Sequence, residues 1–128
     1  MGLAGAFLAV LVTASLLTPD AEGHGTHTQL GMPACAWATA LNRPCPTCGM
    51  TTSFAHAAHA QYLAAARTQP MGFLLTLSTA VGFWFAGHAA ATGSRLDLVL
   101  GGLLRPRVLW TALGLAALAW VYKLLTWQ

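Results

Sequence analysis

Charged residues are scarce in this chain. Three acidic and six basic side chains make up 7% of 128 residues, whereas a soluble domain carries about a quarter charged residues. Hydrophobic residues make up 56% of the chain, and the mean hydropathy is +0.61. Such a chain cannot cover itself with a solvated surface. The composition therefore excludes an ordinary soluble domain and predicts one membrane domain over residues 1–128, with the lipid bilayer as its first partner.

The few charges are also scattered, which excludes further classes of function. The acidic residues Asp20, Glu22 and Asp97 are too few and too dispersed for paired-carboxylate chemistry. No cluster of lysine and arginine with interleaved aromatic residues is present, so no nucleic-acid partner is predicted. No set of nucleophile, base and orienting group is visible either. The sequence predicts no catalytic residue and favours a structural or interaction role over an enzyme.

Two apolar segments, residues 71–92 and 108–127, are each long enough to cross a bilayer, which takes about 20 helical residues. Pro70 precedes the first segment, and proline is common at the first position of a helix. Four aromatic residues lie near the ends of the second segment: Trp110, Trp120, Tyr122 and Trp127. Such positions are typical of membrane interfaces, and Lys123 is expected to reach the interface as well. Both segments are predicted to be transmembrane helices.

A third apolar segment lies at the start of the chain. It is uncharged from Met1 to Leu17 and is followed by Thr18-Pro19-Asp20. A cleaved signal peptide would show a basic first region and a small-x-small cleavage site, and neither is visible. Residues 1–18 are therefore predicted to be a transmembrane helix or an uncleaved signal anchor. The predicted fold class is all-α, an integral membrane protein with two to three transmembrane helices plus an interfacial amphipathic helix.

The arginines of the loops predict the topology, because cytoplasmic loops carry the excess of positive charge. The short loop between the second and third apolar segments holds Arg95, Arg105 and Arg107, whereas the longer first loop holds Arg43 and Arg67. This bias favours a cytoplasmic second loop. The first loop is therefore predicted to lie outside the cytoplasm.

The first loop, residues 19–69, contains all three cysteines and four of the five histidines. Within it, residues 51–67 are rich in alanine and free of proline, which predicts a helix. Its apolar residues recur on one stripe at helical spacing: Phe54, Ala58, Tyr62 and Ala65. A stripe of this kind is typical of an amphipathic helix that lies in the membrane interface.

The run Cys45-Pro46-Thr47-Cys48-Gly49 is the clearest candidate for chemistry. If Cys45 caps a helix that begins at Pro46, the positive end of the helix dipole stabilises a Cys45 thiolate. Cys45 and Cys48 are therefore candidates for a redox pair. The pattern resembles that of glutaredoxins, but no βαβ pattern surrounds it. Gly49 stands where a c-type haem site needs histidine, which argues against haem attachment.

The same residues could instead bind zinc or another soft metal. Cys35 precedes Cys45 by ten residues, and His56 and His59 follow in a C-x2-C-x7-H-x2-H spacing. Thiolates and imidazoles are the ligands that zinc prefers. The candidate ligands are therefore Cys35, Cys45, Cys48, His56 and His59, although the x7 spacer is shorter than the roughly twelve residues usual in zinc fingers.

A third interpretation is structural. In an oxidising compartment Cys35 could pair with Cys45 or Cys48, while Pro46, Gly49 and Thr51 shape a signature turn. The metal, redox and structural interpretations stay open on the sequence alone, and the structural one is favoured because an isolated motif is weak support for chemistry. The remaining loop histidines, His24 and His27, are expected to be solvated.

The run from Cys35 to Phe54, followed by Pro70 and an apolar segment, resembles the small bacterial membrane proteins of the domain-of-unknown-function family 2752. That signature is close to C-P-x-C-G-hydrophobic-T-R, with an upstream cysteine. Here Thr52 stands where the family commonly has arginine. The resemblance implies a multi-pass protein of the bacterial inner membrane and no assigned activity. In addition to the bilayer, the expected partner is another membrane protein or a second copy of the chain.

Overall fold

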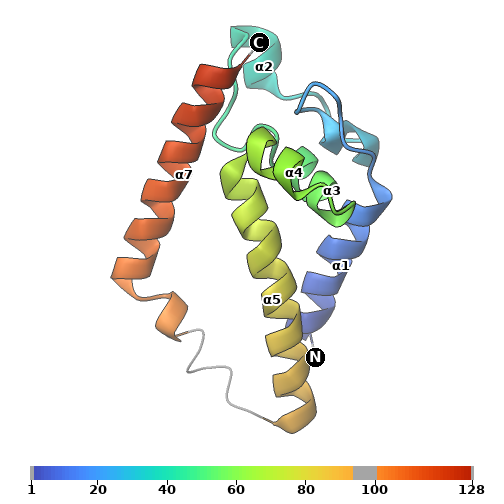
Figure 1. Ribbon diagram of the computed structural model, residues 1–128, viewed down its shortest axis with the longest axis vertical. Coiled ribbons are helices and arrows are strands. Elements are labelled where there is room, and N and C mark those ends of the chain that lie inside the picture. Colours follow the sequence, from blue (N-terminus) through green and yellow to red (C-terminus); the bar gives the residue numbers. More distant parts are fainter. Residues whose placement is uncertain (1, 94–100, 128) are drawn as a thin grey trace.

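The computed structural model describes residues 2–93 and 101–127, and these residues form helices joined by turns, with no strand among them (Figure 1). The elements in chain order are α1 (Gly2–Leu16), η1 (Thr26–Leu30), α2 (Ala36–Leu41), α3 (Met50–Ala58), α4 (Tyr62–Thr68), α5 (Pro70–Thr92) and α7 (Pro106–Thr126). The prediction of an all-α fold is confirmed. Arg95 and Asp97 lie outside the described residues.

Within the described residues, two helices are long and apolar enough to cross a membrane. α5 has 23 residues and a mean hydropathy of 1.3, and α7 has 21 residues and a mean hydropathy of 1.7. Most of both surfaces is exposed, and many of their exposed side chains are large and apolar, as lipid-facing side chains are. Each begins one or two residues before the segment predicted from the sequence. α1 is shorter, at 15 residues, so its role as a span or an anchor stays a prediction.

The long helices differ in how they pack. α5 lies between α1 and α7 in Figure 1, and it contacts α1 extensively but α7 only slightly. Gly82 permits the close approach to α1, because a Cβ atom at this position would lie 2.8 Å from the Phe7 ring. Small residues at helix interfaces serve this purpose in membrane proteins.

The segment predicted as one helix over residues 51–67 forms two helices, α3 and α4. Ala60 adopts a left-handed backbone conformation with φ of +59°, which ends the helical path. The backbone N–H of Gln61 then donates to the His56 carbonyl. Because of this break, the predicted apolar stripe does not form one face.

α3 is packed among α1, α4, α5 and η1. Its buried residues are small, Thr52, Ser53, Ala55 and Ala57. The Ser53 hydroxyl donates to the carbonyls of Ala65 and Gln69, at 2.8 and 3.1 Å. Gly72 of α5 lies directly on Ser53, where a Cβ atom would lie 2.9 Å from the Ser53 Cβ. α3, α4 and the start of α5 therefore form one tight cluster beneath the cysteine-bearing turn.

Candidate functional site

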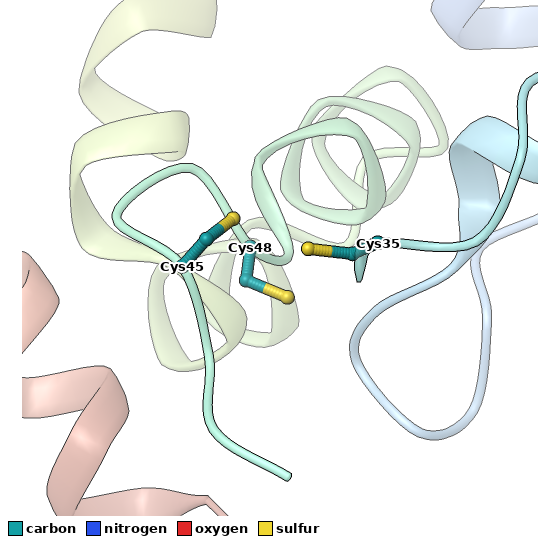
Figure 2. Close-up of side chains that lie close together, drawn as sticks. All are labelled: Cys35, Cys45 and Cys48. Carbon is teal, nitrogen blue, oxygen red and sulfur yellow. The ribbon is translucent and has the colours of Figure 1, made fainter. Parts of the chain in front are cut away.

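The three cysteines converge. Their Sγ atoms all lie within 4.8 Å of one another, and Figure 2 shows the Cys35 side chain directed toward the turn that carries Cys45 and Cys48. Cys48 is buried, whereas Cys35 and Cys45 are partly exposed, and all three are free thiols. Two separate segments of the chain, which meet only in the folded protein, thus supply one cluster of soft ligands.

The turn from Cys45 to Gly49 precedes the helix rather than forming its first turn. The Cys48 N–H donates to the Cys45 carbonyl at 3.0 Å, the Met50 N–H donates to the Thr47 carbonyl at 3.1 Å, and α3 begins only at Met50. The hypothesis of Cys45 as the helix cap is therefore wrong. Gly49 occupies the cap position, with φ of +83°, a conformation that glycine adopts without strain.

Two distant side chains hold this turn in place. The Trp120 indole N–H of α7 donates to the Pro44 carbonyl at 3.1 Å. The Gln69 amide, fully buried at the start of α5, donates to the Pro46 carbonyl at 3.2 Å. The cysteine-bearing turn is thus tied to both helices that are long enough to cross a membrane. Such ties orient the thiols before any ligand arrives.

Cys35 comes from the other segment, at the start of the short helix α2. Its carbonyl accepts the Thr39 N–H at 3.0 Å. Just upstream, the Pro33 carbonyl is 3.1 Å from His27 Nε2, which fixes this stretch of chain against η1. The position of Cys35 therefore depends on the packing of η1 and α2.

A cation also lies at the cluster. The Lys123 ammonium group of α7 donates to the Gly23 and Thr68 carbonyls at 3.2 and 3.1 Å, and the residue is only 6% exposed. It interacts electrostatically with Cys48. Lys123, which the sequence predicts to reach the membrane interface, thus makes a buried contact with the loop. No local pattern signals this contact, since Gly23 and Lys123 are 100 residues apart.

Thr52 stands where the resembled family commonly has arginine, and it makes a different contact here. Its hydroxyl lies 2.7 Å from the Thr26 hydroxyl, and both residues are fully buried. Thr26 Oγ1 also accepts the Asp20 N–H at 3.0 Å. Thr52 thus joins α3 to η1 through one hydrogen bond. Lys123 supplies a cation near the thiols from another part of the chain.

The surroundings of the thiols separate their acidities. Burial, reinforced by the neighbouring Cys45 and Cys35, raises the pKa of the Cys48 thiol to about 11, and Lys123 offsets a small part of this effect. The pKa of Cys35 is lowered, chiefly by a hydrogen bond from the backbone of Ala38. Nothing in the sequence predicts this lowered pKa at Cys35.

The two histidines predicted as metal ligands are not part of the three-thiol group. His56 Nδ1 lies 2.6 Å from the Gln61 side-chain oxygen, and His59 Nε2 lies 3.1 Å from the Leu17 carbonyl. One ring nitrogen of His56 therefore contacts the break after α3, and one ring nitrogen of His59 contacts the end of α1. Of the three residues of the predicted signature turn, Gly49 and Thr51 line the cavity beside the thiols.

The thiols open onto a cavity of about 370 Å³. All three cysteines line it, together with His27, Met32 and Met50. A neighbouring cavity of about 310 Å³ is bordered by Cys35 and Cys48, and on its other side by Glu22, His24 and Trp127. The cluster is therefore reachable by a small ligand from the loop side.

The fold and the site together define an all-α protein with two helices apt to cross a membrane and a cluster of three thiols. Residues 35–83 match the family described as Protein of unknown function (DUF2752), which confirms the resemblance noted in the signature. The matched segment contains all three cysteines and runs from the residue before α2 into α5. No curated protein and no solved structure matches the chain.

Proposed function

We propose that this protein is a multi-pass membrane protein that binds a soft metal ion, zinc or copper(I), through Cys35, Cys45 and Cys48. One observation supports this function above the others, namely the mutual approach of three Sγ atoms within 4.8 Å. Because a zinc–sulfur bond is about 2.3 Å long, two thiolates on one tetrahedral ion lie about 3.8 Å apart. The thiols need only small side-chain rotations to share one ion.

The charges around the cluster favour the same function. Each thiol that binds a metal gives up its proton to solvent, so three thiolates leave a zinc site with one net negative charge and a copper(I) site with two. The buried Lys123 ammonium group lies where it offsets part of this charge. The metal would also displace the proton that burial keeps on the Cys48 thiol.

A structural or interaction role without metal is the second candidate. It is favoured by the ties from Trp120 and Gln69, which make the cysteine-bearing turn a joint between α5 and α7. In that case one pair of thiols forms a disulfide that locks the joint. A disulfide uses only two thiols, however, and does not explain why the third thiol also lies within 4.8 Å of the other two.

Elemental analysis of the detergent-purified chain, prepared under reducing conditions, tests the proposal. We expect about one zinc or copper ion per chain, and loss of the ion when Cys35, Cys45 or Cys48 is replaced singly by serine. The matched controls are His56→Ala and His59→Ala, which should keep the ion because their rings lie outside the three-thiol group.

Two results would contradict the metal function. One is the absence of a stoichiometric ion after reconstitution with zinc or copper(I). The other is a disulfide between two of the cysteines in protein isolated from cells with its thiols trapped, accompanied by a free third thiol. The second result would establish the structural role instead.

A further inference from the structure

The cavity beside the thiols is rich in sulfur. The chain has four methionines, and two of them, Met32 and Met50, line the same cavity as all three cysteines. His27 completes the set of side chains there that can bind a metal. Among the described residues no carboxylate lines this cavity, and its sulfur and imidazole groups are soft or borderline ligands.

This lining distinguishes between the two metals. Thioether sulfur is a ligand for copper(I), whereas zinc is bound by thiolate, imidazole and carboxylate groups. Met50 follows Gly49 directly, at the first position of α3, and so lies next to the turn that carries Cys48. Met32 follows Gly31, which has φ of +77°, and it is 47% exposed.

The exposure of Met32 also needs an explanation. An apolar side chain of this size gains by burial, yet Met32 lines the cavity with nearly half of its surface accessible. A flexible, partly exposed thioether in a thiol-lined cavity can contact an ion that enters and move with it toward the thiols, since methionine has three rotatable side-chain bonds.

We propose that the ion is copper(I), which enters through this cavity and is bound by the three thiolates with Met32 and Met50 as auxiliary thioether ligands. This inference rests on the proposed metal function and specifies its substrate. Binding involves no change of oxidation state: copper(I) arrives as such, and the bound thiols release their protons to solvent. His27 also lines the cavity, and its Nε2 atom lies 3.1 Å from the Pro33 carbonyl.

The test compares the affinities of the purified chain for copper(I) and for zinc(II). Copper(I) is titrated anaerobically against a chromogenic copper(I) chelator, and zinc(II) against a zinc indicator. The test variant is Met32→Leu combined with Met50→Leu, which keeps side-chain volume and removes only the sulfur. We expect copper(I) affinity to fall about 10- to 100-fold, the usual cost of losing a supporting group at a metal site, and zinc(II) affinity to stay unchanged.

Met71→Leu is the matched control, because Met71 lies in α5 and does not line this cavity. It should bind both ions as the unaltered chain does. Met50 also borders an apolar cavity lined by residues of α1, so the single variant Met32→Leu is measured as well. Circular dichroism of each variant checks that the helices are retained.

The outcomes separate the two proposals. If the unaltered chain binds neither ion, both the metal function and the copper(I) inference are wrong. If it binds zinc(II) as tightly as copper(I), or if the methionine variants bind copper(I) with unchanged affinity, the copper(I) inference is wrong and the metal function stands. Preferential copper(I) binding that weakens only in the methionine variants supports the inference.

Discussion

At the scale of single residues, Gly49 is the position on which the site depends most. A Cβ atom there would lie 2.6 Å from the Gly23 carbonyl oxygen and 3.0 Å from Lys123 Nζ. The first of these neighbours is backbone and cannot swing aside. Together with φ of +83°, the close approach makes glycine the one residue that fits between the cysteine-bearing turn and the segment at Gly23.

We therefore expect Gly49→Ala to destabilise the folded protein by about 1–3 kcal/mol, the usual cost of one strained backbone position. The control is Gly87→Ala in α5, where nothing lies within 4 Å of the added Cβ atom and alanine is the better helix former. Thermal unfolding in detergent, followed by circular dichroism, measures both. A Gly49→Ala variant as stable as the Gly87→Ala variant would contradict the described packing.

The thiols of the metal-free protein should differ in their response to pH. The folded state raises the pKa of Cys48 from 9.0 to about 11. Between these values the unfolded chain loses the Cys48 proton while the folded chain keeps it, so the free energy of unfolding should fall as pH rises through this range. Below about pH 9 the Cys48 thiol is protonated in both states and contributes no slope.

Denaturation at several alkaline pH values, in reductant and without metal, measures this slope. In Cys48→Ser the contribution from this thiol is absent, so the variant should lose less stability between about pH 9 and about pH 11 than the unaltered chain. Alkylation rates give an independent reading. Cys35 should react faster than the buried Cys48 near neutral pH, because its pKa is lowered.

At the scale of the elements, α7 is attached to the rest of the molecule mainly by polar side chains at its C-terminal end. Trp120, Tyr122 and Lys123 donate to the carbonyls of Pro44, Arg67, Gly23 and Thr68. Contact between α7 and α5 is slight. The position of α7 is therefore set by hydrogen bonds to the cysteine-bearing loop more than by helix packing.

Replacing Lys123 with methionine should loosen this attachment. The Gly23 and Thr68 carbonyls would lose their donor, which costs about 1–3 kcal/mol for buried groups, and Cys48 would lose its neighbouring cation. We expect a lower unfolding temperature, and slower alkylation of Cys48 in the metal-free protein, because loss of the cation raises the pKa of this thiol further.

The matched control for this change is Tyr122→Phe, which removes the exposed bond to the Arg67 carbonyl and should change stability by less. Both variants are measured in the same detergent. If Lys123→Met leaves both the unfolding temperature and the alkylation of Cys48 unchanged, then Lys123 does not hold α7 against the loop.

At the scale of the whole molecule, the cysteine cluster lies at one end of the long helices. α5 begins beside it and α7 ends beside it, and the two helices diverge toward the other end (Figure 1). If both cross a bilayer, as we propose, the thiols lie at one membrane face and the connection between α5 and α7 lies at the other. Arg105 immediately precedes α7 and Arg107 lies in its first turn, and their charge favours a cytoplasmic location for this end of α7.

We accordingly expect the thiols to be labelled from outside the cytoplasm. Intact cells that express the chain are treated with a membrane-impermeant maleimide, and labelling is compared before and after permeabilisation. The partly exposed Cys45 of a Cys35→Ser, Cys48→Ser variant is the reporter. Labelling that requires permeabilisation would place the loop in the cytoplasm and reverse the proposed topology.

Part of this protein could be predicted from the sequence because it depends on local composition. The long apolar segments predict the helices α5 and α7, because the need to satisfy backbone hydrogen bonds in lipid leaves few alternatives. The pair Cys45 and Cys48 is visible by spacing, and Gly49 by its place in the motif. The all-α class follows from the same local patterns.

Other features were decided only by tertiary structure, because they depend on contacts between distant segments. Packing that no local sequence period encodes decides the break at Ala60 and the start of α3 at Met50. It also decides that His56 and His59 make hydrogen bonds away from the thiols. The approach of Cys35 and Lys123 to the cysteine-bearing turn likewise depends on contacts between distant segments. Composition and spacing thus determined the helices and the motif, whereas the folded chain decided which thiols, and which cation, share the site.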